Sequence, residues 1–236
     1  MVSGFTPASA ITITLDGQTV ASGTAQNDGS FSASFVAPAM PNGDHPVIAT
    51  GGGFTAFNTW RAEANVSLSG NAQHAGPWIV GDQLLFQSDG FLDGSVFAVT
   101  WDGTTMTGGV SDGRGSFSGS FVIAPSAYGL HNAVFTTGSV SVTRTISISP
   151  TLQFSPTSGR VGSTVTIAAT GHDAGTGFRV VFGDAGPTVV TVTSGANGSF
   201  ATTFTVPTHT TRSELVLVYV DSSSILRSLA TFNVIP

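Results

Sequence analysis

The protein has 236 residues, of which 40% are apolar and only 8% charged, with a formal net charge of −6 and no cysteine. Its basic residues are seven arginines scattered singly, so the basic stripe expected of a nucleic-acid-binding protein is missing. The lack of cysteine excludes disulfides and thiolate metal sites. No apolar run is long enough to predict a membrane span, and Met1 is not followed by the segments of a signal peptide.

The N-terminal part of the chain predicts short β-strands separated by turns. Residues 4–17 read GFTPASAITITLDG, in which apolar residues alternate with polar ones before an Asp-Gly turn. Residues 29–38 read GSFSASFVAP, which predicts a turn and then an alternating strand that ends at a proline. Residues 41–51, PNGDHPVIATG, predict a further strand.

The same three elements return in order in the middle of the chain. They are GFLDGSVFAVTWDG at residues 90–103, GSFSGSFVIAP at 115–125 and AYGLHNAVFTTG at 127–138. His131 in the third of these segments matches His45 in its first copy. Such self-similarity at a fixed period indicates a repeat architecture.

The C-terminal part repeats two of the three elements. They are GHDAGTGFRVVFGD at residues 171–184 and GSFATTFTVP at 198–207, while HTTRSELVLVYVD replaces the third. The Phe of Gly-Ser-Phe therefore recurs after 86 and then 83 residues. A repeat of this length with about seven short strands is the size of an immunoglobulin-like β-sandwich.

We therefore predict an all-β chain of three tandem immunoglobulin-like β-sandwich domains. The expected domains are residues 1–63, 64–149 and 150–236. In each Gly-Ser-Phe turn the glycine supplies the positive φ of a tight turn, and the phenylalanine points into the sandwich. The predicted structural turn residues are Gly29, Phe31, Gly115, Phe117, Gly198 and Phe200.

The third repeat opens with residues 155–184, SPTSGRVGSTVTIAATGHDAGTGFRVVFGD. Its SPTSG segment, the VTI at 165–167 and the VFG at 181–183 resemble IPT/TIG-type immunoglobulin-like domains. The later NGSF…TFTVP and the earlier NGDHPV are similar to tandem immunoglobulin-like modules of large prokaryotic surface proteins. The resemblance implies a stalk, adhesin, filament subunit or accessory module of a secreted enzyme, and fold alone does not decide among these.

The first domain is expected to lack its first strand and nearly all of its second. About twenty residues that hold two strands precede Gly171, and two strand-like segments precede Gly90, but only three residues precede Gly4. One interpretation is an incomplete sequence; the other is that another copy supplies the strands by β-strand addition. The open edge would include Met1, Val2, Ser3, Gly4 and Phe5.

Few residues suggest chemistry. Asp89, Asp93 and Asp102 lie close in sequence and are weak calcium candidates, although Asp-Gly is also common turn chemistry. Ser111 lies in GVSDG, which matches a nucleophile elbow, but its position in a predicted hairpin indicates a chance match. His45, like His131, is expected to be structural because it recurs with the repeat. We predict no catalytic residue and no cofactor.

The tryptophans suggest either packing or sugar binding. Trp101 alternates with Val99 and Phe97, which predicts a core position. Trp78 lies in a Gly-Pro loop, where it is expected to make a ligand contact or, by preference, a packing contact.

These observations favour a non-catalytic structural protein of an extracellular or cell-surface assembly. A filament, surface-layer or stalk subunit would associate with other copies of itself, and a surface poor in charge suits such packing. A carbohydrate-binding or adhesive module, with polysaccharide as partner, is the alternative of a different class. A virion or tail structural protein, which needs no signal peptide, is a further alternative.

Overall fold

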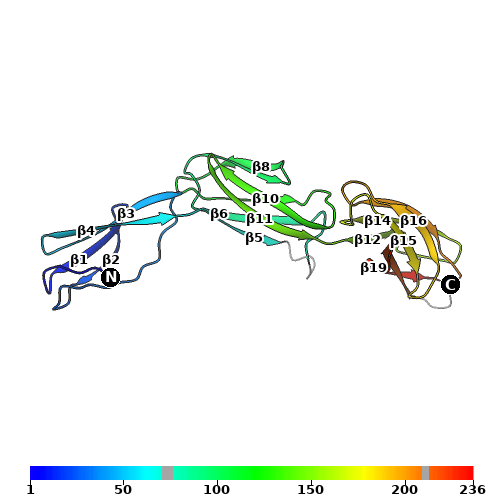
Figure 1. Ribbon diagram of the computed structural model, residues 1–236, viewed down its shortest axis with the longest axis horizontal. Coiled ribbons are helices and arrows are strands. Elements are labelled where there is room, and N and C mark those ends of the chain that lie inside the picture. Colours follow the sequence, from blue (N-terminus) through cyan, green and yellow to red (C-terminus); the bar gives the residue numbers. More distant parts are fainter. Residues whose placement is uncertain (71–76, 209–212, 236) are drawn as a thin grey trace.

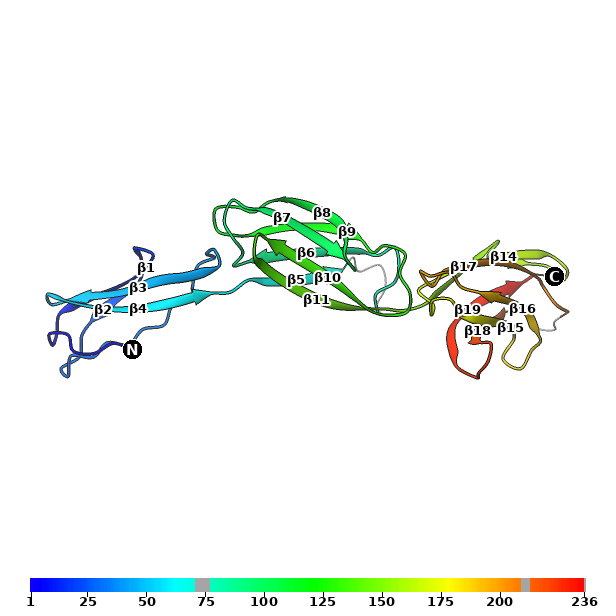
Figure 2. The same ribbon diagram turned by 45° about the horizontal axis from the view of Figure 1, so that its top comes forward.

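The computed structural model describes residues 1–70, 77–208 and 213–235 and contains strands and turns but no helix in these ranges. A helix able to cross a membrane is therefore not found among the described residues. The strands form five sheets, arranged as three groups that follow one another along the long axis (Figures 1 and 2). The chain is thus all-β and built from tandem immunoglobulin-like repeats, as predicted.

The first group of strands, within residues 1–62, forms a single antiparallel sheet in the order β2-β1-β3-β4. Its strands are β1 (Ala10–Leu15), β2 (Gln18–Thr24), β3 (Gly43–Gly51) and β4 (Phe54–Ala62). Asp16 and Gly17, with φ angles of 49° and 78°, form the two-residue hairpin turn that an Asp-Gly pair favours. Ile11, Ile13 and Leu15 are buried on one face of β1 because strand side chains alternate.

The second group forms two sheets, ordered β5-β6-β9 and β11-β10-β7-β8. Its strands are β5 (Asn65–Gly70), β6 (Gln83–Asp89), β7 (Val96–Trp101), β8 (Thr104–Val110), β9 (Phe117–Val122), β10 (Gly129–Thr137) and β11 (Val140–Ile148). Phe86 of β6 and Phe135 of β10 meet edge to face between the sheets, with ring centroids 5.2 Å apart. Trp101 is buried in the same core, as its alternation indicated.

The third group also forms two sheets, ordered β12-β14-β17 and β13-β19-β18-β15-β16. Its strands are β12 (Thr151–Ser155), β13 (Ser158–Gly159), β14 (Thr164–Thr170), β15 (Gly177–Phe182), β16 (Thr188–Thr193), β17 (Phe200–Thr205), β18 (Ser213–Val220) and β19 (Leu226–Val234). Phe182 and Phe204 meet in its core at 5.7 Å. The predicted boundaries at 63/64 and 149/150 lie between the groups, and we keep them as our proposed division.

The 86-residue period aligns the first sheet with only one sheet of the second group. β1, β2, β3 and β4 correspond to β7, β8, β10 and β11, and both sheets have the same strand order. The counterpart of the β5-β6-β9 sheet is reduced to one bridge, in which Val2 pairs with Phe31. That bridge corresponds to the Ser88–Phe117 pair of β6 and β9.

The strand predicted after Phe31 is wrong for the first repeat. Residues 32–41 have no strand pairing, whereas the equivalent β9 pairs along its whole length with β6. A strand needs a neighbour for its backbone amides and carbonyls, and beyond Val2 the first repeat supplies none. Residues 32–36 thus keep the alternating sequence of a strand but are not part of a sheet.

The Gly-Ser-Phe turns are closed in the same way in all three copies. The amides of Gln26, Asp112 and Gly195 donate to the carbonyls of Ser30, Ser116 and Ser199 at 2.8–2.9 Å. A side-chain oxygen of Asp28, Asp112 or Asn197 accepts further amides of its own turn. Hydrogen bonds from the hydroxyl and amide of Ser30 lower the pKa of Asp28. The turns are therefore self-contained scaffold elements.

Candidate functional site

The inward face of β4 is only partly covered. Trp60 on this strand is 44% exposed, whereas Ile146, which holds the same position on β11, is 4% exposed. Phe54, at the other end of the inward face, is 57% exposed. Large apolar side chains at core positions are exposed here because the sheet that would cover them is missing.

In the second domain, β5 and β6 cover the equivalent inward face of β11. β5 lies over β11: the Arg144 side chain of β11 donates to the Val66 carbonyl of β5 at 2.8 Å. Val66 itself is buried, as are Leu84 and Phe86 of β6. In the first domain no described strand occupies the place of β5 or β6.

A second position in the first domain is open where its counterparts are filled. At Gly90 and Gly171 a Cβ atom would overlap the backbone carbonyls of Glu63 and Ser149, just before the first strand of each domain. At Gly4, the matching residue, nothing lies within 4 Å of the Cβ position. Of the predicted open edge, Met1, Ser3 and Gly4 are exposed.

Two residues of that predicted edge are not free. Val2 exchanges both backbone hydrogen bonds with Phe31 at 2.9 Å. Phe5 is only 5% exposed and packs with Phe31 in a small apolar cluster. Including Phe5 in the open edge was wrong, because its ring is part of the small apolar core that packs on the single sheet.

One backbone hydrogen bond recurs at both domain junctions. The amide of Asn42 donates to the carbonyl of Phe91 at 2.8 Å, and the amide of Tyr128 donates to the carbonyl of His172 at 2.9 Å. Asn42 and Tyr128 are separated by the 86-residue period. The repeated unit therefore includes the residue that donates the hydrogen bond to the next domain.

The Gly-Ser-Phe turns lie at these junctions. The carbonyls of Gly115 and Gly198 accept hydrogen bonds from the amides of Phe91 and His172. The carbonyls of Phe91 and His172 are the acceptors of the two junction hydrogen bonds. Both glycines have positive φ, 70° and 68°, and a Cβ on Gly115 would overlap the Phe91 carbonyl. A side chain at this position would displace the acceptor of the junction hydrogen bond.

A repeated His–Asp pair supports the loop that donates this bond. His45 lies 2.6 Å from Asp16 through Nδ1 and 2.9 Å from the Pro41 carbonyl through Nε2. His131 makes the same contacts with Asp102 at 2.5 Å and with the Ala127 carbonyl at 2.8 Å. Both ring nitrogens of each histidine face oxygen acceptors, and for His45 the doubly protonated ring satisfies this arrangement.

The pKa of His45 is raised by this setting. Partial burial alone would lower it, but the hydrogen bonds to the Pro41 carbonyl and the Asp16 carboxylate outweigh burial. His172, in the core of the third domain, shows the opposite effect, since burial lowers its pKa. Its Nε2 lies 2.8 Å from the Ser228 hydroxyl.

The second junction has an additional contact. The guanidinium of Arg227 lies over the ring of Tyr128 from the preceding domain, 4.8 Å from its centroid. Two hydrogen bonds to Asp173, at 2.5 and 3.1 Å, hold the guanidinium in place. Tyr128 thus contacts the third domain through both its amide and its ring.

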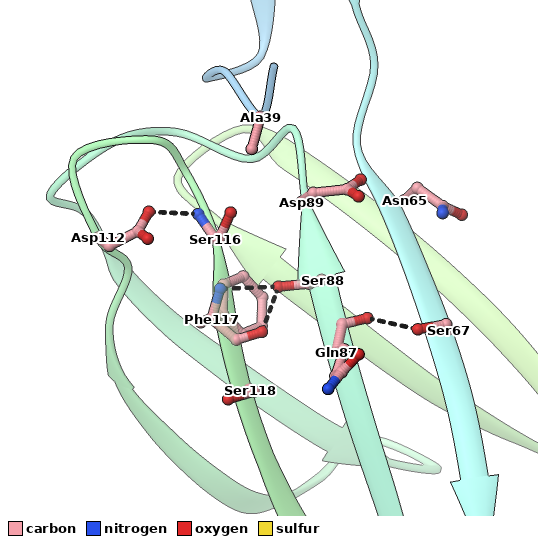
Figure 3. A pocket seen from close by; sticks show the side chains of 10 residues that line it. All are labelled: Ala39, Asn65, Ser67, Gln87, Ser88, Asp89, Asp112, Ser116, Phe117 and Ser118. Atoms are coloured by element: carbon pink, nitrogen blue, oxygen red, sulfur yellow. Dashed lines mark hydrogen bonds between the residues drawn. The ribbon is translucent and has the colours of Figure 1, made fainter. Parts of the chain in front are cut away.

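A polar hollow of about 470 Å³ lies where the first domain meets the sheet of β5, β6 and β9 (Figure 3). Its lining residues are Ala39, Asn65, Ser67, Gln87, Ser88, Asp89, Asp112, Ser116, Phe117 and Ser118. Several already bond to one another, including Ser88 with Phe117 and Asp112 with Ser116. The one aromatic residue in this lining, Phe117, is buried, so the hollow offers no exposed ring to a sugar.

The three aspartates proposed for calcium are not brought together. Asp102 bonds to His131 and to the Asn132 amide, and Asp89 lines the polar hollow, while Asp93 lies in the turn before β7. No group of three or more histidine and acidic side chains suited to a metal occurs among residues 1–70, 77–208 and 213–235. Although the three aspartates are close in sequence, they do not form a common site in the structure.

Two further candidates have packing roles. Trp78 is half-buried, and a Cβ on Gly70 would meet its ring; it also pairs with Ile148 beside the second core. Ser111 is 4% exposed and bonds to the Leu92 carbonyl at 2.6 Å. Ser194 makes the matching bonds in the third domain, so the serine of GVSDG fastens a turn.

Sequence reasoning missed the His–Asp pairs and the junction hydrogen bonds. The signal for the pairs was present, because Asp16 and His45 recur as Asp102 and His131 with the same period. The junction bonds join backbone groups, and no side-chain pattern marks them.

No family model and no curated protein matches the chain. Solved structures with a similar arrangement include the Yersinia pseudotuberculosis adhesin InvE, with 12% identity and a TM-score of 0.31, covering 73% of this chain and 60% of that one. Another is the Bacteroides ovatus protein SGBP-B in complex with a mixed-linkage heptasaccharide, with 14% identity and a TM-score of 0.35, covering 96% and 60%. A third is a tetra-tandem repeat of a large adhesion protein, with 18% identity and a TM-score of 0.31, covering 98% and 68%.

The chain thus spans 60% of the length of the first two structures. At these identities and TM-scores the matches concern the repeated β-sandwich arrangement alone.

Proposed function

We propose that the protein is a non-catalytic structural module of an extracellular or cell-surface assembly, such as a filament, surface-layer or stalk subunit. The observation that carries the proposal is the repeated junction, in which Asn42 bonds to Phe91 and Tyr128 bonds to His172. A contact copied with the repeat positions each domain on the next one, which is what an extended spacer requires. We further propose that the third domain is of the IPT/TIG type, on the residues that carry that resemblance.

The uncovered first domain supplies the contact to a neighbouring subunit in this proposal. Trp60 and Phe54 are exposed at core positions, and the backbone of residues 32–41 has no strand partner. Exposed strand edges pair readily with another chain. Completion of the sandwich by a neighbour's strands would therefore join subunits by burying apolar surface and pairing backbone groups.

Electron microscopy of the native assembly tests this function. Ordered fibres, surface arrays or stalks that an antibody against this chain labels at a regular repeat are the expected result. Labelling of material without regular repeat, together with retention of the purified chain on insoluble polysaccharide, would replace it with a carbohydrate-binding role. Trp78→Ala is the matched variant for that second outcome, since this substitution should abolish retention if Trp78 contacts sugar.

A further inference from the structure

We propose that the junction between the first and second domains is a protonation-dependent hinge, in which the His45 ring holds the peptide group that bonds to the second domain. This peptide group joins Pro41 to Asn42. Its carbonyl lies 2.9 Å from Nε2 of His45, and its N–H donates to the Phe91 carbonyl at 2.8 Å. The inference goes beyond the proposed function, because it concerns how the stiffness of the chain changes with pH.

The peptide group couples the two hydrogen bonds mechanically. Because it is planar, its carbonyl and its N–H turn together. A rotation that moves the Pro41 carbonyl away from His45 also turns the Asn42 N–H away from Phe91. The side-chain amide of Asn42 donates to the carbonyl of Ala62 at 3.3 Å, at the end of β4, where the chain leaves the first domain. The orientation of this peptide group therefore affects both contacts of Asn42 at the junction.

The protonation state of His45 determines whether both of its partners are satisfied. Nδ1 lies 2.6 Å from a carboxylate oxygen of Asp16, and Nε2 faces the Pro41 carbonyl. Both partners only accept, so the doubly protonated ring donates to both. When the ring loses one proton to solvent, the remaining proton stays on Nδ1, because a carboxylate is the stronger acceptor. The lone pair of Nε2 then faces the Pro41 oxygen, and the carbonyl loses its donor.

The charged groups around His45 favour the doubly protonated ring. Burial lowers the pKa of His45, but the hydrogen bonds to Pro41 and Asp16 and the charges of Asp16 and Asp44 outweigh burial and raise it above 6.5. On the neighbouring strand β4, Arg61 lies opposite Asp44 and bonds to it at 2.9 Å. The loop at residues 37–42 has no titratable side chain. The hinge is therefore expected to loosen as the pH rises above 6.5.

This arrangement does not depend on the strands that the first domain lacks. In the second domain, which has both of its sheets, His131 makes the same contacts with Asp102 and the Ala127 carbonyl. The N–H of the corresponding peptide group also bonds to the next domain, at 2.9 Å. The side chains of His45 and His131 are 12% and 14% exposed. The geometry at His45 is thus that of a complete repeat.

Distances between spin labels on the two domains test the hinge in the intact chain. The labels are attached through Ser22→Cys and Thr105→Cys, at exposed positions on β2 and β8, and the chain has no other cysteine. We expect a narrow distance distribution at about pH 5.5 and a broader one at about pH 9. The pair Thr105→Cys and Thr143→Cys, within the second domain, is the control and should give the same distribution at both pH values.

Nuclear magnetic resonance tests the coupling through the peptide group. The amide proton of Asn42 should move upfield as the pH rises, because its hydrogen bond to Phe91 weakens. Its midpoint should equal that of the His45 ring protons and should lie above pH 6.5. An Asn42 amide signal that does not titrate together with the His45 ring would overturn the proposal.

Three variants assign the response to His45. His45→Gln is neutral throughout and should abolish the pH dependence of the distance between the first and second domains. His131→Gln, at the equivalent position of the second domain, is the matched control and should retain it. Asp16→Asn removes the charge that favours the protonated ring and should shift the midpoint to lower pH, which provides a test even if His45→Gln fails to fold.

Several results would overturn the hinge. They are equal distribution widths at the two pH values, a pH response that persists in His45→Gln, and an unshifted midpoint in Asp16→Asn. Broadening of the control pair within the second domain would also overturn it, because the pH effect would then be a loosening of the domain itself.

Discussion

Trp60 and Ile146 hold the same inward position in successive repeats, yet the first is 44% exposed and the second 4%. The difference arises from the strands opposite them, since β5 and β6 cover Ile146, whereas no described strand lies over Trp60. The exposure of a large apolar side chain at a core position is the most informative feature of this molecule.

This relationship predicts unequal effects of truncation at the two positions. Ile146→Ala should destabilise the second domain by about 2–5 kcal/mol, because it leaves a cavity in a closed core. Trp60→Ala should cost less than Ile146→Ala does, because 44% of the Trp60 surface stays exposed to water and no closed cavity is left. Native-state hydrogen exchange of the β10 and β3 amides reports the two effects separately; equal costs would show that the first domain is closed.

The turn glycines should be intolerant of a side chain. Gly115→Ala is expected to destabilise the second domain by more than about 2 kcal/mol, since φ is positive and the new methyl would overlap the Phe91 carbonyl. Gly113→Ala, two residues away with open space around its Cβ position, is the matched control and should be nearly neutral. Thermal unfolding of both variants checks this, and similar melting temperatures would count against it.

His45 should make the first domain more stable at acidic than at alkaline pH. Its pKa is raised above the ordinary value of 6.5, so its contribution is fully present below 6.5 and is lost as the pH rises through the folded-state pKa. Exchange of the β1 and β3 amides across this range measures the effect. His45→Gln should abolish the pH dependence, and an unchanged profile would exclude His45 as its source.

His172 should make the third domain more stable at neutral than at acidic pH, the opposite of the effect of His45 on the first domain. Burial lowers its pKa below 6.5, so its contribution is present above 6.5 and is lost as the pH falls toward the folded-state value. Exchange of the β15 and β18 amides in the same samples follows it. Protection that increases on acidification in this domain would contradict the assignment.

Tyr128 should restrict the angle between the second and third domains. Tyr128→Ala removes the cation–π contact with Arg227, about 0.5–1 kcal/mol at an exposed site, and should broaden the distance distribution between labels on these domains. Tyr219→Ala removes a similar contact with Arg179 inside the third domain and should leave the distribution unchanged. Because the chain has no cysteine, two introduced cysteines are the sole labelling sites.

The sequence predicted the repeat, the fold class and the missing strands of the first domain, because apolar alternation and turn glycines are local signals. It was wrong on the strand after Phe31, because strand formation depends on a partner that local alternation does not report. It was also wrong on Phe5, whose burial compensates for a sheet that is absent. Asp89, Asp93 and Asp102 did not come together, because they lie at the end of β6, in the turn before β7 and in the hairpin turn between β7 and β8.

The His–Asp pairs and junction bonds required coordinates for a different reason. Asp16 and His45 are far apart in sequence and meet because β1 and β3 are adjacent. The period shared by the two pairs could have suggested the contact, but only strand order establishes it.

Hydrogen–deuterium exchange of two equivalent segments in one sample tests the uncovered first domain most directly. Residues 32–36 have no strand partner, while residues 118–122 pair with β6 in the same chain. We expect the amides of 32–36 to exchange at nearly unprotected rates, and the alternate amides of 118–122 that point to β6 to be strongly protected. Equal protection of both segments in the purified chain would contradict the account.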